Sequence, residues 1–286
     1  MSLPKYPKIS IVTPSFNQAV FLEATIKSVI NQNYPNLEYI IIDGGSSDGS
    51  VEIIKKYEQY LHYWCSEADG GQYDAINKGF RHSTGEIMGW INSDDMYLPW
   101  AFKTVADIMS TLPEIEWLTT LCRGFWDYHG FCSGFRLIPG YSIEAFLDGF
   151  YLPFNNSKGI GFIQQESTFW RRKLWTKAGG YVSTDLKLAS DFELWCRFYT
   201  YSPLYGTPSP LGGFRSQFSQ KSRNIEDYVK EAELSLVHMR HSLRWKPNFY
   251  RNMFISLKFN RIPKISKIAL SQWGYKCKKV IRQKAD

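Results

Sequence analysis

Residues 86–97 read EIMGWINSDDMY, and the order of residue types in this stretch indicates a strand followed by a candidate site. Residues 86–91 form an apolar run of the length expected for a buried strand. Asp94 and Asp95 follow at its carboxyl end, where paired carboxylates can hold a hard divalent cation that takes further ligands from substrate phosphates. The local alternative is a turn that caps the next helix, because Asn, Ser and Asp also begin loops.

Residues 8–91 alternate regularly between strand and helix patterns, which predicts an α/β fold with a mostly parallel central sheet flanked by helices. Ligands of such sheets bind at the carboxyl ends of the strands, and polar loops at 14–18, 43–48 and 92–95 follow three predicted strands. The predicted strands are 8–13, 37–42, 61–65 and 86–91, and the predicted helices are 19–31, 50–60 and 72–81.

The pattern after residue 99 is mixed. Aromatic and glycine residues in 124–140 predict a hairpin, and strong periodicity in 225–243 predicts a helix. Further predicted helices are 99–110, 171–178 and 189–201, and further predicted strands are 116–122, 162–170 and, as a strand or a loop, 204–214.

The net charge of +7 is unevenly distributed along the chain. Residues 240–286 contain 13 Lys or Arg and one acidic residue, which leaves 21 basic and 26 acidic residues in the remainder. Basic residues mixed with Trp273 and aliphatic side chains fit a helix lying on an anionic membrane surface, and the alternative is a helix packed on the domain. No apolar run is long enough to span a bilayer, and no nucleic-acid-binding motif accompanies the charge.

The five cysteines form no CxxC motif, and no signal pattern precedes Lys8. These features predict a cytoplasmic protein, with the basic tail placing it peripherally on the inner face of the cell membrane.

The loops at the strand ends carry further candidate residues. Thr13 and Pro14 end the first strand without a glycine, which argues against a dinucleotide-binding dehydrogenase. Asp43 ends the second strand and could accept hydrogen bonds from a base or ribose, although capping of its own loop explains it in part. Residues 67–79 place carboxylates, an amide and a cation around one helix, and capping accounts for Asp69 or Asp74 but not for the whole cluster.

Asp191 stands near the start of the predicted helix 189–201. A carboxylate there can favour the helix dipole or can serve as a general base. The stretch 164–170, QQESTFW, offers amides and an aromatic ring of the kind that recognise and stack on sugars, and a packing role for Trp170 is the alternative.

In this order and spacing, six segments resemble the family 2 glycosyltransferases, which are inverting enzymes of the GT-A fold. The resemblance covers roughly residues 8–220 and implies a GT-A domain at 1–222, with a nucleotide-binding half at 1–98, an acceptor half at 99–222, and a helical basic extension at 223–286. The segments are SIVTPSFNQAVFLEATIKSVINQ, YIIIDGGSSDGS, EADGGQYDAINKGF, TGEIMGWINSDD, QQESTFWRRKLW and SDFELWCRF.

The resemblance also implies roles for individual residues. Asp191 would be the catalytic base, and Asp94 and Asp95 would bind Mn²⁺ or Mg²⁺. Many members have an Asp where this chain has Asn92, which leaves open whether Asp94 or Asp95 dominates metal binding. The chain also has Gly44 where a second Asp is common. The nucleotide-sugar would contact Thr13, Pro14, Asp43, Asp69, Asn77, Lys78 and Asp94, and the acceptor would contact Gln165, Glu166 and Trp170.

The function implied is transfer of a sugar, UDP-linked by expectation, from a nucleotide-sugar donor to a hydroxyl of a glycan or lipid-linked acceptor in cell-surface polysaccharide synthesis. One rival is a nucleotidyltransferase, but its Gly-rich basic phosphate loop is missing from residues 13–18. A non-catalytic GT-A scaffold protein is the other rival, and retention of Asp94, Asp95 and Asp191 argues against it.

Overall fold

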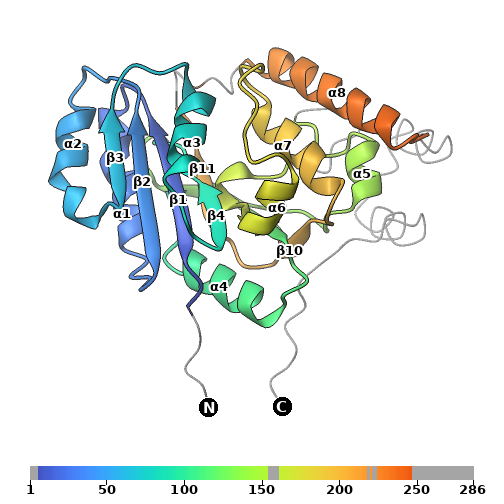
Figure 1. Ribbon diagram of the computed structural model, residues 1–286, viewed down its shortest axis with the longest axis horizontal. Helices are drawn as coiled ribbons and strands as arrows, with labels where there is room; N and C mark the ends of the chain where they lie inside the picture. Colours follow the sequence, from blue (N-terminus) through green and yellow to red (C-terminus); the bar gives the residue numbers. More distant parts are fainter. Residues whose placement is uncertain (1–5, 154–160, 218–219, 221–223, 247–286) are drawn as a thin grey trace.

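The computed structural model describes residues 6–153, 161–217, 220 and 224–246 (Figure 1). Its larger sheet has seven strands in the order β10-β6-β9-β4-β1-β2-β3, with β3, β2, β1 and β4 parallel to one another. β9 runs antiparallel to both β4 and β6, and β10 is parallel to β6. The strands are β1 (Ile9–Ser15), β2 (Leu37–Asp43), β3 (Tyr63–Ser66), β4 (Ile87–Trp90), β6 (Trp117–Thr120), β9 (Phe169–Arg171) and β10 (Tyr205–Thr207).

The central strands are buried on both faces, which confirms the predicted α/β architecture. Along β2, Ile40 and Ile42 pack into the hydrophobic cluster that contains α3 and α7, and Tyr39 and Ile41 pack into the cluster that contains α1 and α4. This alternation explains why the strand reads as one apolar run. The helices are α1 (Ala19–Ile30), α2 (Ser50–Lys56), α3 (Gln72–Arg81), α4 (Ala101–Thr111), α5 (Ile143–Leu147), α6 (Arg172–Lys177), α7 (Ser190–Tyr199) and α8 (Ile225–Ser242).

A smaller sheet joins segments that lie far apart in the sequence. Its order is β5 (Met96–Tyr97), β11 (Gly212–Arg215), β7 (Cys122–Trp126) and β8 (Cys132–Leu137). The antiparallel pair β7–β8 confirms the hairpin predicted in 124–140. Gly213 lets β11 approach β7, because a Cβ atom at this position would lie 2.2 Å from Trp126 Nε1.

Three predicted elements differ from the structure. Of the strand predicted at 162–170, only β9 at Phe169–Arg171 forms, and Gln165–Ser167 is instead a 3₁₀ turn, η2. The segment 204–214 contains two strands, β10 and β11, in different sheets, because two prolines between them lack the N–H that a continuous strand would donate. The helix predicted at 50–60 is α2 followed by a 3₁₀ turn, η1 (Glu58–Tyr60).

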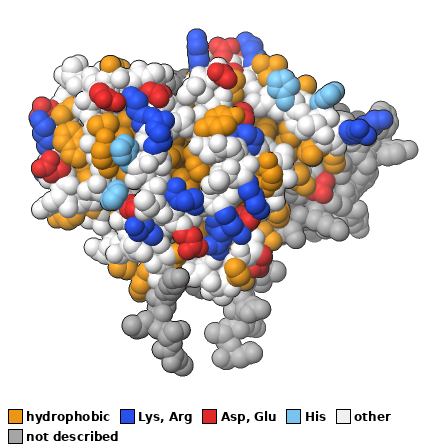
Figure 2. Space-filling view, viewed as in Figure 1, with side chains coloured by type: hydrophobic (Ala, Val, Ile, Leu, Met, Phe, Trp, Pro, Cys, Tyr) orange, Lys and Arg blue, Asp and Glu red, His pale blue; other side chains and the backbone are white. Residues whose placement is uncertain are grey.

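The predicted helix 225–243 is confirmed as α8, which packs alongside α7 (Figure 1). Most of the basic segment, residues 247–286, lies outside the described residues. On the face shown in Figure 2, Lys and Arg side chains are interspersed with Asp and Glu side chains. Within the described part of the chain, no helix has the length and apolar character needed to cross a bilayer.

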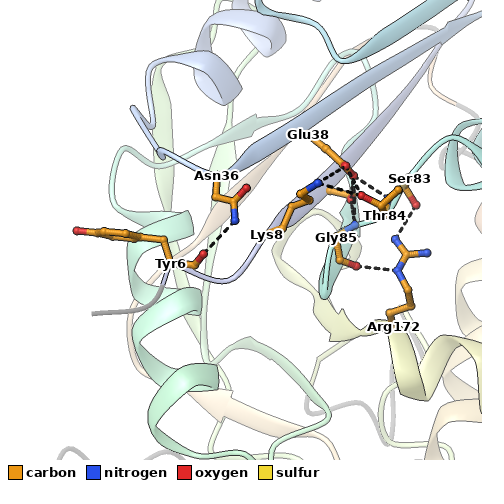
Figure 3. A network of polar contacts seen from close by, with 9 residues as sticks. Tyr6, Lys8, Asn36, Glu38, Ser83, Thr84, Gly85 and Arg172 are labelled. Atoms are coloured by element: carbon orange, nitrogen blue, oxygen red, sulfur yellow. Dashed lines mark hydrogen bonds and ion pairs between the residues drawn. The ribbon is translucent and has the colours of Figure 1, made fainter. Parts of the chain in front are cut away.

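A buried carboxylate joins three strands at the amino end of the large sheet (Figure 3). Glu38 Oε2 accepts hydrogen bonds from Ser10 Oγ at 2.6 Å and from the backbone N of Thr84 at 2.7 Å. Lys8 Nζ contacts Glu38 Oε1 at 3.0 Å. Arg172 bonds the adjoining loop through the Gly85 carbonyl oxygen at 2.8 Å. The carboxylate therefore ties β1, β2 and the approach to β4 together.

The pKa of Glu38 predicts how stability depends on pH. Burial raises this pKa, but the hydrogen bonds from Ser10 and Thr84 together with Lys8 outweigh burial and lower it to about 2, against 4.5 for an ordinary Glu. The stabilisation of about 3 kcal/mol should be present above pH 4.5 and be lost as the pH falls towards 2. In urea unfolding, Glu38→Gln should therefore be destabilised at pH 7, and its difference from the wild type should shrink towards pH 3.

Glu52→Gln, which changes an exposed side chain on α2, is the matched control and should leave the free energy of unfolding unchanged at both pH values. A difference between Glu38→Gln and the wild type that stays constant with pH would contradict this account of the network.

Candidate active site

Three loops meet at the carboxyl edge of the parallel strands. Residues 14–18, 43–48 and 92–95 follow the adjacent strands β1, β2 and β4, as the sequence predicts. Hydrogen bonds join the first two loops: the Gly44 N donates to Ser15 O at 2.8 Å, and the Ser47 N donates to Asn17 Oδ1 at 3.0 Å. The edge therefore has a fixed shape before any ligand binds.

Asp94 and Asp95 occupy different environments. Asp95 is 1% exposed, and its Oδ1 accepts the backbone N–H of Arg215 at 2.9 Å. Burial, followed by the nearby charges of Asp94 and Glu166, raises the pKa of Asp95 well above its usual range. Asp94 is half-buried and accepts hydrogen bonds from the side-chain amide of Gln217 at 2.5 Å and of Gln220 at 3.3 Å. Asp94 is thus the carboxylate that a ligand can reach.

Asn92 connects the acidic loop to both halves of the site. Its Oδ1 accepts a hydrogen bond from Gln72 Nε2, at the start of α3, at 2.7 Å. Its Nδ2 lies 3.3 Å from Asp95 Oδ2 and 3.5 Å from Gln165 Oε1. An ionised Asp at position 92 would have no hydrogen to donate to the Asp95 carboxylate. The Asn92 amide has one, and it therefore suits a position beside this buried acid.

Asp191 lies on the first turn of α7 and is partly accessible. Its Oδ1 accepts hydrogen bonds from the Phe192 N at 2.8 Å and from the Tyr228 hydroxyl at 3.0 Å. Burial raises the pKa of Asp191 to about 6, although these two hydrogen bonds lower it. A carboxylate with this pKa is largely ionised at neutral pH and retains enough basicity to accept a proton.

Glu166 lies in η2, within electrostatic range of Asp94 and Asp191. It is 3% exposed, and its Oε1 has no hydrogen-bond partner. Burial raises the pKa of Glu166 to about 8, with Asp94 adding to the effect, so this side chain is mostly protonated at neutral pH. The site thus contains one mostly protonated acid, Glu166, within electrostatic range of two accessible carboxylates, Asp94 and Asp191.

The residues predicted to contact the nucleotide make different contacts within the protein. Asp43 is fully buried and anchors its own loop: Oδ2 accepts the Ser46 N at 2.8 Å and Ser66 Oγ at 2.7 Å, and Oδ1 accepts Ser46 Oγ at 2.5 Å. The Thr13 hydroxyl pairs with the Tyr39 hydroxyl at 3.1 Å, and Pro14 is buried. Nucleotide contacts by Thr13, Pro14 and Asp43 stay predictions.

Asp69 lies directly over Gly44. A Cβ atom at Gly44 would lie 3.1 Å from Asp69 Oδ2, so the Asp69 carboxylate occupies the space that a side chain at position 44 would need. Position 44, where an Asp is common in the family pattern, is Gly in this chain, and Asp69 of the β3–α3 loop places a carboxylate there instead. Lys78 lies nearby on α3 and pairs with Glu67 at 3.0 Å and with Asp74 at 3.5 Å.

Two side chains predicted to bind substrate make contacts within the protein, and a nucleotide-sugar contact by Asn77 stays a prediction. The Asn77 amide forms two 2.8 Å hydrogen bonds with the backbone N and O of Val182, which ties α3 to the segment before α7. Trp170 is 0% exposed and packs among Trp90, Trp175 and other core rings, so no sugar can stack on it. The packing alternative is therefore correct for Trp170. Gln165 lies in the site, where its Nε2 donates to Trp90 O at 2.7 Å.

Arg171, which follows the QQESTFW stretch, lies at the opposite end of the sheet from the acidic loop. It pairs with Ile87 at the amino end of β4, and its guanidinium bonds Glu86 at 2.6 Å and the Ile115 carbonyl oxygen at 2.9 Å. Arg215 is the cation that reasoning from sequence missed: it lies within electrostatic range of Asp94 and Asp95. The FR pair at 214–215 at the end of a Gly-Gly strand was its only local signal.

The comparisons with known proteins agree with this geometry. Residues 10–124 match the family described as glycosyl transferase family 2. This match covers 115 of the 286 residues of the chain. An uncharacterized glycosyltransferase of Mycobacterium tuberculosis is 42% identical over 92 residues, covering 32% of this chain and 35% of the relative. An uncharacterized glycosyltransferase of Rickettsia conorii is 26% identical over 245 residues, covering 82% of this chain and 38% of the relative.

The putative teichuronic acid biosynthesis glycosyltransferase TuaG of Bacillus subtilis is 34% identical over 94 residues, covering 32% of this chain and 37% of TuaG. The matches to these three relatives thus span little more than a third of each relative's length.

Two solved structures share the fold of this chain. TarS 1–349 of S. aureus, in complex with UDP-GlcNAc, has a TM-score of 0.62 at 17% identity and covers 94% of this chain and 76% of that one. The mannosyltransferase PcManGT of Pyrobaculum calidifontis, in complex with GDP-Man and Mn²⁺, has a TM-score of 0.59 at 17% identity, with the same coverage of 94% and 76%. The chain therefore has the GT-A fold.

Single substitutions of the two adjacent acids should have different effects. Asp94→Ala should abolish Mn²⁺-dependent binding of UDP or GDP in calorimetric titration while leaving the melting temperature nearly unchanged, because Asp94 is half-buried. Asp95→Ala should lower the free energy of unfolding by about 1–3 kcal/mol, since the buried Arg215 N–H loses its acceptor. Equal loss of stability in the two variants would contradict this division of roles.

Proposed function

We propose that the chain is an inverting glycosyltransferase that uses Asp191 as its general base. The observation that carries this proposal is the state of the Asp191 carboxylate: Oδ1 accepts two hydrogen bonds, whereas no hydrogen bond from a described residue reaches Oδ2. With a pKa raised to about 6 by burial, this oxygen can take a proton near neutral pH.

The reaction is a single displacement at the anomeric carbon. The acceptor hydroxyl gives its proton to Asp191 Oδ2 as its oxygen bonds to that carbon, and the bond to the nucleoside diphosphate breaks on the opposite face. The leaving group takes the bonding electron pair, so the anomeric configuration inverts. Lys78 and Arg215 are the cations that we place on the diphosphate side.

Mn²⁺ or Mg²⁺ is the cofactor we propose. Among the described residues, no three His, Cys, Asp or Glu side chains are grouped to hold a metal ion. Asp94 nevertheless offers carboxylate oxygens, which suit a hard cation that takes its other ligands from water and phosphate, and the Gln217 amide lies beside it as a hydrogen-bond donor. When bound, the cation supplies positive charge to the departing diphosphate. PcManGT, of the same fold, is described in complex with Mn²⁺.

We further propose a UDP-linked donor and a glycan or lipid-linked acceptor in cell-surface polysaccharide synthesis. TarS is described in complex with UDP-GlcNAc, and TuaG is named for teichuronic acid biosynthesis. Gln165 and Glu166 are the acceptor-side groups in this proposal, because they lie between the acidic loop and Asp191.

A donor screen tests the proposed reaction. With Mn²⁺ or Mg²⁺, one of UDP-GlcNAc, UDP-glucose, UDP-galactose or GDP-mannose should release nucleoside diphosphate, and EDTA should stop the release. Asp191→Asn keeps the shape of the side chain but cannot accept a proton, so turnover should fall about 10²-fold or more with donor affinity nearly unchanged. A loss confined to donor affinity would give Asp191 a binding role and overturn its assignment as the base.

We also propose that the basic segment 240–286 brings this cytoplasmic enzyme to the inner face of the membrane, where a lipid-linked acceptor would be presented. Its 13 basic residues against one acidic residue support this proposal. At about 1 kcal/mol for each basic residue near an anionic surface, four or five engaged side chains give recruitment that weakens with salt. Co-sedimentation should show binding to anionic but not neutral liposomes, and removal of residues 244–286 should abolish it. Equal binding to both liposome types would contradict the membrane role.

A further inference from the structure

Helix α8 contacts the proposed base, Asp191, and both lie outside the residues that match the family. The matched region is 10–124, and α8 is Ile225–Ser242. On α8, the Tyr228 hydroxyl donates to Asp191 Oδ1 at 3.0 Å. One turn further along, the Glu231 carboxylate accepts the backbone N–H groups of Leu188 and Ala189 at 2.9 Å each and that of Lys187 at 3.2 Å. Two side chains of one helix thus contact the base and the segment leading into it.

The Glu231 contacts lie just before α7 and not within it. Glu231 accepts the backbone N–H groups of two residues that precede the helix and of its N-cap residue, Ala189, and so holds the segment that leads into α7. Tyr73, on α3, fixes the other side of the same segment by donating its hydroxyl to Leu188 O at 2.6 Å.

The hydrogen bonds on Asp191 are divided unequally. Both the Phe192 N–H and the Tyr228 hydroxyl bond Oδ1, and no described residue bonds Oδ2. A carboxylate held by one oxygen has a fixed plane, so its other oxygen points in a fixed direction. Orientation of a base by a third group is the arrangement that general-base catalysis requires.

We infer that α8 is a positioning element, in which Tyr228 and Glu231 act through Asp191 by fixing its carboxylate plane and the start of its helix. This inference rests on the proposed role of Asp191 as the base. It assigns to α8 an indirect part in the reaction, through Asp191, separate from the proposed membrane role of the basic segment.

The groups that face Asp191 determine the direction of the effect. They are Tyr73 from α3, Glu166 from η2, and Tyr228 and Glu231 from α8. Of these, the Tyr228 hydroxyl hydrogen-bonds to the charged carboxylate and lowers its pKa. Loss of this hydroxyl should therefore raise the pKa of Asp191, because burial remains and the stabilising donor is gone.

The test compares Tyr228→Phe with Tyr141→Phe. Tyr141 is a fully buried tyrosine whose hydroxyl donates to Thr120 O at 3.0 Å, so the control removes the same group from a buried hydrogen bond that does not involve Asp191. Carboxyl ¹³C NMR of aspartate-labelled full-length protein gives the midpoint of Asp191, assigned by the signal missing from Asp191→Asn. Tyr228→Phe should move this midpoint up by about 1 pH unit, and Tyr141→Phe should leave it in place.

Kinetics with the donor found in the screen provide the second readout. In Tyr228→Phe, kcat should fall about 10-fold at pH 7 with the KM for the donor unchanged, and the acidic limb of the pH profile should shift upward with the NMR midpoint. Glu231→Gln, which keeps the shape but weakens the acceptor for three N–H groups, should lower kcat without altering KM.

The outcomes separate the two proposals. An Asp191 midpoint in Tyr228→Phe that equals that of the wild type, or a Glu231→Gln enzyme with full kcat, overturns the positioning role of α8. Full activity of Asp191→Asn overturns the proposed base instead, whatever the NMR midpoint does. If Tyr228→Phe does not fold, Glu231→Gln alone decides the inference through its kcat.

Discussion

Burial of the parallel strands on both faces is the constraint on which the rest of the structure depends. Because β1, β2 and β4 present apolar side chains to helices on either side, charged groups can stand only where the strands begin or end. At one edge Glu38 is ionised and saturated with donors, and it holds the strands in place. At the other edge Asp94 and Asp191 are reachable and Glu166 has an oxygen without a partner. The same chemical group thus stabilises one edge and remains available for chemistry at the other.

The carboxyl edge concentrates acidic groups at an energetic cost. Asp95 and Glu166 both have raised pKa values, because burial disfavours their charged forms and Asp94 repels them. Protonation of Glu166, whose pKa is raised to about 8, limits the negative charge that accumulates beside Asp94. A bound cation and the Arg215 guanidinium would reduce the repulsion further, which supports the proposed binding of a diphosphate at this edge.

The sequence predicted those parts of the fold that depend on local pattern. The alternation through residue 91, the hairpin and α8 all follow from periodicity within one segment. The second sheet could not be predicted, because β5 has two residues and pairs with β11, which lies more than a hundred positions later. Likewise, nothing near Asn77 indicates that its amide pairs with Val182, and an aromatic residue such as Trp170 reads alike in a core and in a binding site. The family resemblance supplied Asp191 and Asp94, whereas Tyr228 and Glu231 belong to an ordinary amphipathic pattern.

The contacts of α8 bear on how this protein could diverge from its relatives. A division of the chain after residue 222 would separate Asp191 from the Tyr228 hydroxyl and the start of α7 from the Glu231 carboxylate. Exchange of the C-terminal segment between related genes would then alter the acidity of Asp191, the proposed base, and leave the loops after β1, β2 and β4 untouched. Selection could therefore tune the pH range of such an enzyme independently of the nucleotide-sugar that it uses.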